Sequence, residues 1–153
     1  GPDDPSATGD VPRGDMIDLR ENDTLLSEAL DEHVPDDGHA TDPGVYSLDI
    51  AVPDEGHESH ARRWLTSGYG TVPPFLPQLV ACDKAIYVGR SSNVRARLED
   101  HLEGRVRTAS LPSVYEVRAI DSVVFGENSD TRERQRADEL AVQYGPDVYV
   151  HSR

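Results

Sequence analysis

The sequence of 153 residues has one cysteine, one lysine and no hydrophobic run long enough to cross a membrane. The single cysteine, Cys82, excludes a disulfide within the chain and a cysteine-rich metal site. Such low cysteine usage is typical of a reducing compartment. We therefore expect a cytoplasmic protein without a membrane partner.

Acidic residues exceed basic ones by 29 to 15, which gives a net charge of −14. Residues 1–60 hold 17 acidic side chains and two arginines, whereas residues 61–153 hold 13 basic and 12 acidic side chains. The acidity therefore belongs to the first part of the chain. The second part is nearly neutral, so its net charge does not oppose binding to nucleic acid.

The choice of charged residues is also unusual, with 14 arginines against one lysine and 18 aspartates against 11 glutamates. This combination resembles the proteins of extremely halophilic archaea, whose surface carboxylates stay hydrated in concentrated salt. At about 1 M salt the Debye length is roughly 3 Å, so repulsion among these charges is screened. We predict a halophilic, archaeal origin; the alternative is an acidic tail on an ordinary mesophilic protein.

Periodicity and turn residues divide the chain in two. Residues 1–43 are predicted to be an acidic, partly disordered segment with a short helix at 22–34. Residues 44–153 are predicted to form one domain with an insertion at about 52–83. Strands are expected at 45–52, 85–89, 114–120 and 123–127. Helices are expected at 93–102 and in the segment after Ser129 or Asp130, either of which can be the N-cap, with an end before Pro146. The predicted fold class is α+β, with a small, mostly antiparallel central sheet flanked by helices.

Two polar residues share the inner face of the helix at 93–102. Val94, Leu98 and Leu102 repeat every four residues and mark the face that packs on the sheet. Arg97 and His101 fall on the same face by spacing. A guanidinium turned toward a core needs an anion, either from an internal salt bridge or from a ligand or substrate.

A tyrosine stands beside a glycine in each of two predicted strands, in the tripeptides Gly44-Val45-Tyr46 and Tyr87-Val88-Gly89. The pattern S-x-N-V-x-x-R-L-x-x-H follows over 91–101. Together these motifs resemble the GIY-YIG nucleases. The resemblance implies that Tyr46 and Tyr87 line an active site and that Arg97 is its catalytic arginine. It places His101 at a frequent active-site histidine or tyrosine position, and Gly89 at a close turn from strand to helix.

The resemblance also implies hydrolysis of a phosphodiester with one divalent metal, Mg²⁺ or Mn²⁺. A tyrosine, helped by its neighbours, would orient or deprotonate water, while Arg97 would neutralise charge on the phosphate. The family's metal-binding glutamate falls on Ala137 in this chain. Glu133 lies one turn earlier on the same helix face, and we predict it as the metal ligand. The alternatives are that Glu133 pairs with Arg97 or caps the helix.

The predicted function is a DNA endonuclease, with RNA as an alternative substrate and a homodimer or a DNA-binding protein as partner. Lys84, Arg90, Arg95 and Arg105 are predicted to contact the nucleic acid. The alternative is a catalytically inactive module that binds nucleic acid or protein. The position of Glu133 should discriminate between them. A glutamate in the same pocket as the tyrosines favours the enzyme, and one that points to solvent favours the binding module.

Three further features are expected to be structural. The histidines of the His57-x-x-His60 pair are predicted to be solvated in a polar loop rather than metal ligands. Trp64 is predicted to anchor the core, and His151 has no visible partner.

Overall fold

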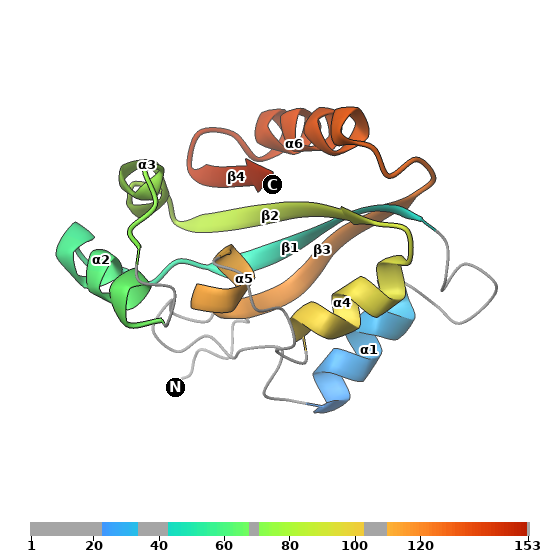
Figure 1. The fold of residues 1–153 in the computed structure, drawn as a ribbon, viewed down its shortest axis with the longest axis horizontal. Coiled ribbons are helices and arrows are strands. Elements are labelled where there is room, and N and C mark those ends of the chain that lie inside the picture. Colours follow the sequence, from blue (N-terminus) through green and yellow to red (C-terminus); the bar gives the residue numbers. More distant parts are fainter. Residues whose placement is uncertain (1–22, 34–42, 68–70, 103–109, 153) are drawn as a thin grey trace, which may run out of the picture.

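A four-stranded sheet forms the centre of the molecule (Figure 1). The computed structural model describes residues 23–33, 43–67, 71–102 and 110–152. The strand order is β3-β1-β2-β4, with β1 antiparallel to both β2 and β3 and with β4 parallel to β2. The strands are β1 (Gly44–Ala51), β2 (Lys84–Ser91), β3 (Val117–Phe125) and β4 (Val148–Ser152).

The α+β class is confirmed, but the sheet is mixed rather than mostly antiparallel. The reason is the helix α6 (Asp130–Tyr144), which carries the chain back along the sheet so that β4 runs in the same direction as β2. The two strands predicted at 114–120 and 123–127 form the single strand β3. Two extra residues, Arg118 and Asp121, are accommodated in its pairing with β1 as bulges.

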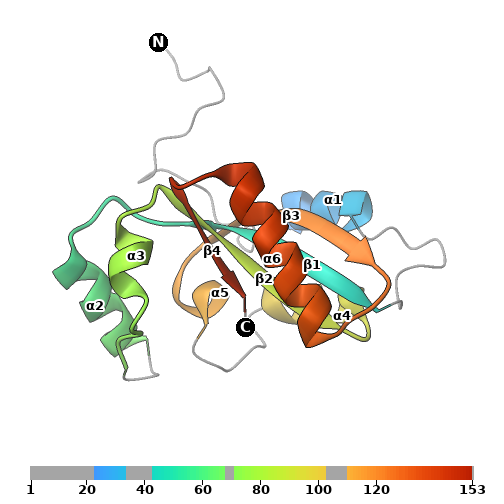
Figure 2. The same cartoon turned by 90° about the horizontal axis from the view of Figure 1, so that it is seen from above.

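Helices cover both faces of the sheet (Figures 1 and 2). On one face lies α6, which contacts β1, β2 and β4. The other face carries α4 (Val94–Leu102), α5 (Leu111–Val114) and α1 (Asp23–His33). The segment predicted to be an insertion contains α2 (His57–Thr66) and α3 (Leu76–Val80), which lie at one end of the sheet. None of the described helices has both the length and the apolar composition needed to cross a bilayer.

Alternation along the strands divides the interior into two cores. In β1, Tyr46, Leu48 and Ile50 belong to the larger core, together with Leu98 of α4. Val45 belongs to a second core on the α6 side, with its remaining members on β2 and α6 (Ile86, Val88, Ala137 and Leu140). Because successive side chains point to opposite faces, neighbouring residues of β1 and β2 serve different cores.

The helix predicted in the acidic segment is present as α1 and packs against β3. Its Leu30 is buried in the larger core, with Leu26 and Ala29 packed beside it. The predicted helix therefore contributes to the same core as the sheet. Residues 1–22 and 34–42 of the predicted segment lie outside the described residues.

A buried polar network joins α2 to Tyr115, the residue that follows α5. The prediction for His60 is wrong: it lies on α2 rather than in a loop and is fully buried. Its Nε2 donates to the Pro53 carbonyl at 3.0 Å, which leaves Nδ1 to accept from the Tyr115 hydroxyl at 2.9 Å. The Tyr115 oxygen in turn accepts from Trp64 Nε1 at 3.0 Å. Trp64 is buried in the core, as predicted.

Candidate active site

Tyr46 and His101 meet in the core between β1 and α4. The Tyr46 Oη lies 2.8 Å from His101 Nε2, and their ring centroids are 5.6 Å apart. Both side chains are buried, which confirms the predicted inward direction of His101. A direct phenol–imidazole hydrogen bond in a buried site holds both rings in place and can carry a proton between them.

Gly89 leaves the space that the Tyr46 ring occupies. The two residues face each other in the β1–β2 pairing. A Cβ atom at Gly89 would lie 2.5 Å from Tyr46 Oη and 2.6 Å from its Cζ. The expectation that Gly89 turns the chain into the helix is wrong, because Gly89 lies within β2 and the strand continues to Ser91. The glycine is needed so that the phenol can cross the strand on its way to His101.

Tyr87 lies between two histidines. Its ring is edge-on to His101 at 5.6 Å and nearly parallel to His151 at 6.3 Å, with an angle of 26° between the planes. His151 faces Tyr87 in the parallel pairing of β2 with β4. Its Nδ1 lies 3.2 Å from the Tyr149 hydroxyl. Burial lowers the pKa of His151 and raises the pKa of Tyr149, so both side chains are favoured in their neutral forms.

Arg97 is half-buried on α4, one turn before His101. Its backbone N–H donates to the Asn93 carbonyl at 3.1 Å as part of the helix. Among the residues that the structure describes, its guanidinium makes no ion pair or hydrogen bond. The described part of the chain therefore contains neither an internal salt bridge of Arg97 nor the pairing with Glu133 that was the alternative. A partly desolvated guanidinium in this situation is suited to an external anion.

Glu133 is buried on α6 and contacts the end of β2. Its Oε1 lies 3.6 Å from Arg90 Nε, while Arg90 Nη2 lies 2.6 Å from Asp130 Oδ1. A third nitrogen of the same guanidinium, Nη1, donates to the Asn128 carbonyl at 2.8 Å. The helix is capped by Ser129, whose side chain accepts from the Arg132 backbone N–H, rather than by Glu133.

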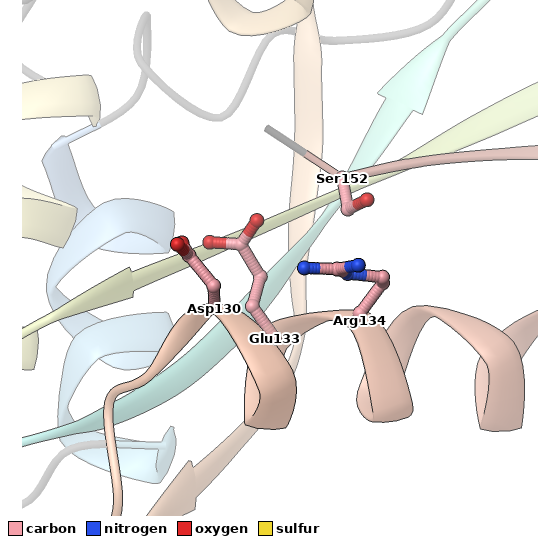
Figure 3. A pocket seen from close by; sticks show the side chains of 4 residues that line it. All are labelled: Asp130, Glu133, Arg134 and Ser152. Carbon is pink, nitrogen blue, oxygen red and sulfur yellow. The ribbon is translucent and has the colours of Figure 1, made fainter.

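A pocket of about 340 Å³ opens beside these carboxylates. Asp130, Glu133, Arg134 and Ser152 line it, and Figure 3 shows the Glu133 carboxylate between Asp130 and Arg134. Carboxylate and hydroxyl oxygens are the donors that Mg²⁺ and Mn²⁺ prefer, so the donor set fits such a metal. Within the described ranges, no group of three or more His, Cys, Asp and Glu side chains is placed to hold a metal.

The predicted site residues fall into two groups on opposite faces of the sheet. Tyr46, Tyr87 and His101 belong to the face covered by α4, whereas Glu133 belongs to the face covered by α6 (Figure 1). None of the tyrosines lines the pocket of Glu133. Both groups lie toward the same end of β2. Gly89 faces the side of the tyrosines and its neighbour Arg90 faces the side of Glu133, since successive strand positions alternate between the two faces of the sheet. Glu133 thus lies neither with the tyrosines nor in solvent.

Two of the other residues predicted to contact nucleic acid, Lys84 and Arg95, are paired within the chain. Lys84 Nζ lies 3.7 Å from Asp49 Oδ2 and 4.5 Å from the centre of the Tyr144 ring. Arg95 lies 3.6 Å from Glu99 and 3.9 Å from Asp31. Partly exposed pairs of this kind are weak and leave the cation free to exchange partners. Arg105 lies outside the described residues.

The sequence reasoning missed Asp130, the Asn128 carbonyl and His151. The sequence could have indicated Asp130, because it is an acidic residue in the first turn of the helix and lies about one turn before the candidate ligand Glu133, on the same side of the helix. His151 carried none, because its contact with Tyr87 depends on strand pairing between residues 64 positions apart.

No family model, curated protein or solved structure matches this chain. Function therefore has to follow from the geometry of the site.

Proposed function

We propose that the chain is a GIY-YIG-like endonuclease that hydrolyses DNA phosphodiester bonds with the help of a divalent metal. The observation that carries the proposal is the placement of Arg97. This half-buried guanidinium has no ion pair or hydrogen bond among the described residues, and it precedes by one turn a histidine that is bonded to a motif tyrosine. A cation without an anion among the described residues, one helical turn before a buried group that can take up a proton, matches the needs of phosphodiester hydrolysis.

The proton-handling part of the site is the Tyr46–His101 pair with Tyr87 at the edge of the imidazole. The hydrogen bond between Tyr46 Oη and His101 Nε2 keeps the imidazole in one orientation. Tyr87, held between His101 and His151, brings a second phenol to the same cluster. We assign to these three side chains the orientation of the attacking water and the removal of its proton.

The phosphate-binding part is Arg97. Its planar guanidinium offers two parallel N–H donors to two phosphate oxygens, which fixes the phosphate as well as neutralising it. In a partly desolvated position, this interaction strengthens as negative charge grows on the phosphate. Arg97 therefore stabilises the transition state more than the ground state.

The metal part is assigned to Glu133 and Asp130, which would hold Mg²⁺ or Mn²⁺ in the pocket on the α6 side. Because the pocket and the tyrosines lie on opposite faces of the sheet at the same end of β2, the ion would supply positive charge to the leaving 3′ oxygen only of a phosphate bound across that end of the strand. DNA is the proposed substrate, with RNA as the alternative. A domain of this size would gain sequence specificity from a second copy or a DNA-binding partner protein.

One observation favours the alternative of a binding module that does not cut. The Glu133 carboxylate lies on the opposite face from the tyrosines and is already paired with Arg90. In such a module Arg97 would bind phosphate, and no bond would be broken.

Plasmid nicking tests the proposal. Supercoiled DNA is incubated with the protein in high KCl with Mg²⁺ or Mn²⁺, and binding to a labelled duplex is measured by anisotropy in EDTA. We expect nicking to fall by about 10²-fold or more in Arg97→Ala and Glu133→Gln. The control Arg62→Ala, which removes an exposed arginine 3.7 Å from Glu58, should keep full activity.

Each outcome separates the proposals. Equal nicking by Arg97→Ala overturns the assignment of the site. Binding without nicking by the wild-type protein favours the binding module, whereas neither binding nor nicking excludes both functions.

A further inference from the structure

Arg90 occupies the place of a cation among three oxygen acceptors. Its Nη2 contacts Asp130 at 2.6 Å, its Nε lies 3.6 Å from Glu133, and its Nη1 donates to the Asn128 carbonyl at 2.8 Å. The three acceptors follow one another at the start of α6 and converge on a single guanidinium. Two of them, Asp130 and Glu133, also line the pocket assigned to the metal.

We propose that Arg90 is a resident cation that blocks the metal site until a nucleic-acid phosphate draws its guanidinium away. The inference rests on the proposed function, because it concerns the same carboxylates. Because phosphate displaces the Arg90 guanidinium from the carboxylates, metal and nucleic acid bind cooperatively.

The first step is the competition between Arg90 and the metal. A divalent ion held by Asp130 and Glu133 would share the two carboxylates that the guanidinium now contacts, and two cations on the same pair of carboxylates repel each other. The Glu133 side chain is only 4% exposed, so loss of its ion pair with Arg90 favours the arrival of another cation. Metal binding is therefore opposed as long as the guanidinium stays.

The second step is the route by which Arg90 leaves. Its side chain is 34% exposed and its partner Asp130 is 75% exposed, so the outer ion pair is open to solvent. The flexible stem of arginine lets the guanidinium move while the backbone stays paired in β2. A phosphate offers the guanidinium the same bidentate geometry as a carboxylate.

The third step is thermodynamic linkage. If phosphate takes Arg90 from the carboxylates, bound nucleic acid raises the affinity of the carboxylates for metal. Bound metal must then raise the affinity for nucleic acid by the same factor. The metal site is thereby filled mainly when substrate is present.

A purely structural role is the rival explanation, in which Arg90 only ties the start of α6 to β2. The two explanations predict different changes in metal affinity when Arg90 is removed. Removal of a structural ion pair leaves metal affinity unchanged or lowers it through loss of local order, whereas removal of a competing cation raises it.

Titration of the protein with Mn²⁺, followed by electron paramagnetic resonance at fixed KCl, tests this difference. We expect Arg90→Met to bind Mn²⁺ at least about tenfold more tightly than the wild-type protein, because a competing charge has gone. Arg134→Met removes another arginine that lines the same pocket, and serves as the control for a general change of charge. It should change affinity less. The double variant Arg90→Met/Glu133→Gln should lose the gain.

Unchanged or weaker Mn²⁺ binding by folded Arg90→Met overturns the proposal, as does an equal gain in Arg134→Met. A second measurement on the wild-type protein does not depend on the folding of any variant. Mn²⁺ is titrated with and without a phosphorothioate oligonucleotide, with the metal bound by the oligonucleotide alone subtracted. We expect the oligonucleotide to tighten Mn²⁺ binding several-fold. No tightening overturns the linkage.

These measurements are independent of cleavage. If the plasmid is never nicked but Mn²⁺ binding changes as expected, the role of Arg90 stands and the nuclease proposal fails. If nicking occurs without any effect of Arg90 on Mn²⁺ binding, the nuclease proposal stands and the role of Arg90 fails.

Discussion

Replacement of Gly89 by alanine tests the geometry of the Tyr46–His101 pair. The new Cβ would lie 2.5 Å from Tyr46 Oη, 2.6 Å from Cζ and 3.0 Å from Cε2, all below normal contact. Tyr46 is fully buried and bonded to His101 at 2.8 Å, so its ring cannot withdraw without breaking that bond. Gly89 does not have a positive φ, so the backbone itself accepts alanine.

The expected cost of Gly89→Ala is about 1–3 kcal/mol of unfolding free energy, the usual range for overpacking. The matched control is Gly56→Ala, where a Cβ atom meets nothing within 4 Å and φ is −71°. Gly56 is the N-cap of α2, so its replacement should cost less than about 1 kcal/mol. The contrast isolates the contact with the phenol from the general effect of replacing glycine.

A double-mutant cycle locates the strain. Tyr46→Leu removes all three atoms that the new Cβ would meet, so Gly89→Ala should cost less than about 0.5 kcal/mol in that background. The free energies come from urea unfolding at constant KCl, followed by the fluorescence of Trp64, the single and buried tryptophan. An equal cost of Gly89→Ala with and without the phenol would refute the reasoning. Equal stability of the Gly89 and Gly56 variants would do the same.

Two further predictions concern the buried network and the histidine beside Tyr87. Tyr115→Phe removes the hydroxyl that accepts a hydrogen bond from Trp64 and donates one to His60. The unfolding free energy, measured in urea titrations, should therefore fall by about 2–4 kcal/mol. A loss under about 0.5 kcal/mol would contradict the assigned hydrogen bonds. Burial lowers the pKa of His151 below its ordinary 6.5, so the unfolded chain binds more protons below about pH 6.5 and stability should fall as the pH drops toward the folded pKa. His151→Phe should reduce that slope by up to about 1.4 kcal/mol per pH unit in urea titrations repeated across this pH range, and an unchanged slope would contradict the burial of the imidazole.

Local pattern was enough to predict most of the elements. Alternation and β-branched content placed β1 and β2 within one or two residues of their ends, and the four-residue spacing of apolar residues placed α4. The same spacing predicted that His101 faces the core, because helical geometry alone decides which side chains share a face. The merging of two predicted strands into β3 was not visible, since a bulge depends on the partner strand.

The sequence by itself thus determined the α+β class, the main helices and strands, and the inward direction of His101, since each follows from short-range periodicity. Only the tertiary structure decided which residues share a site. Parallel pairing of β4 with β2 brings His151 to Tyr87, and packing of α6 on the far face separates Glu133 from the tyrosines and delivers it to Arg90. These outcomes depend on the direction of strand pairing and on the choice of sheet face, which contacts between distant residues decide.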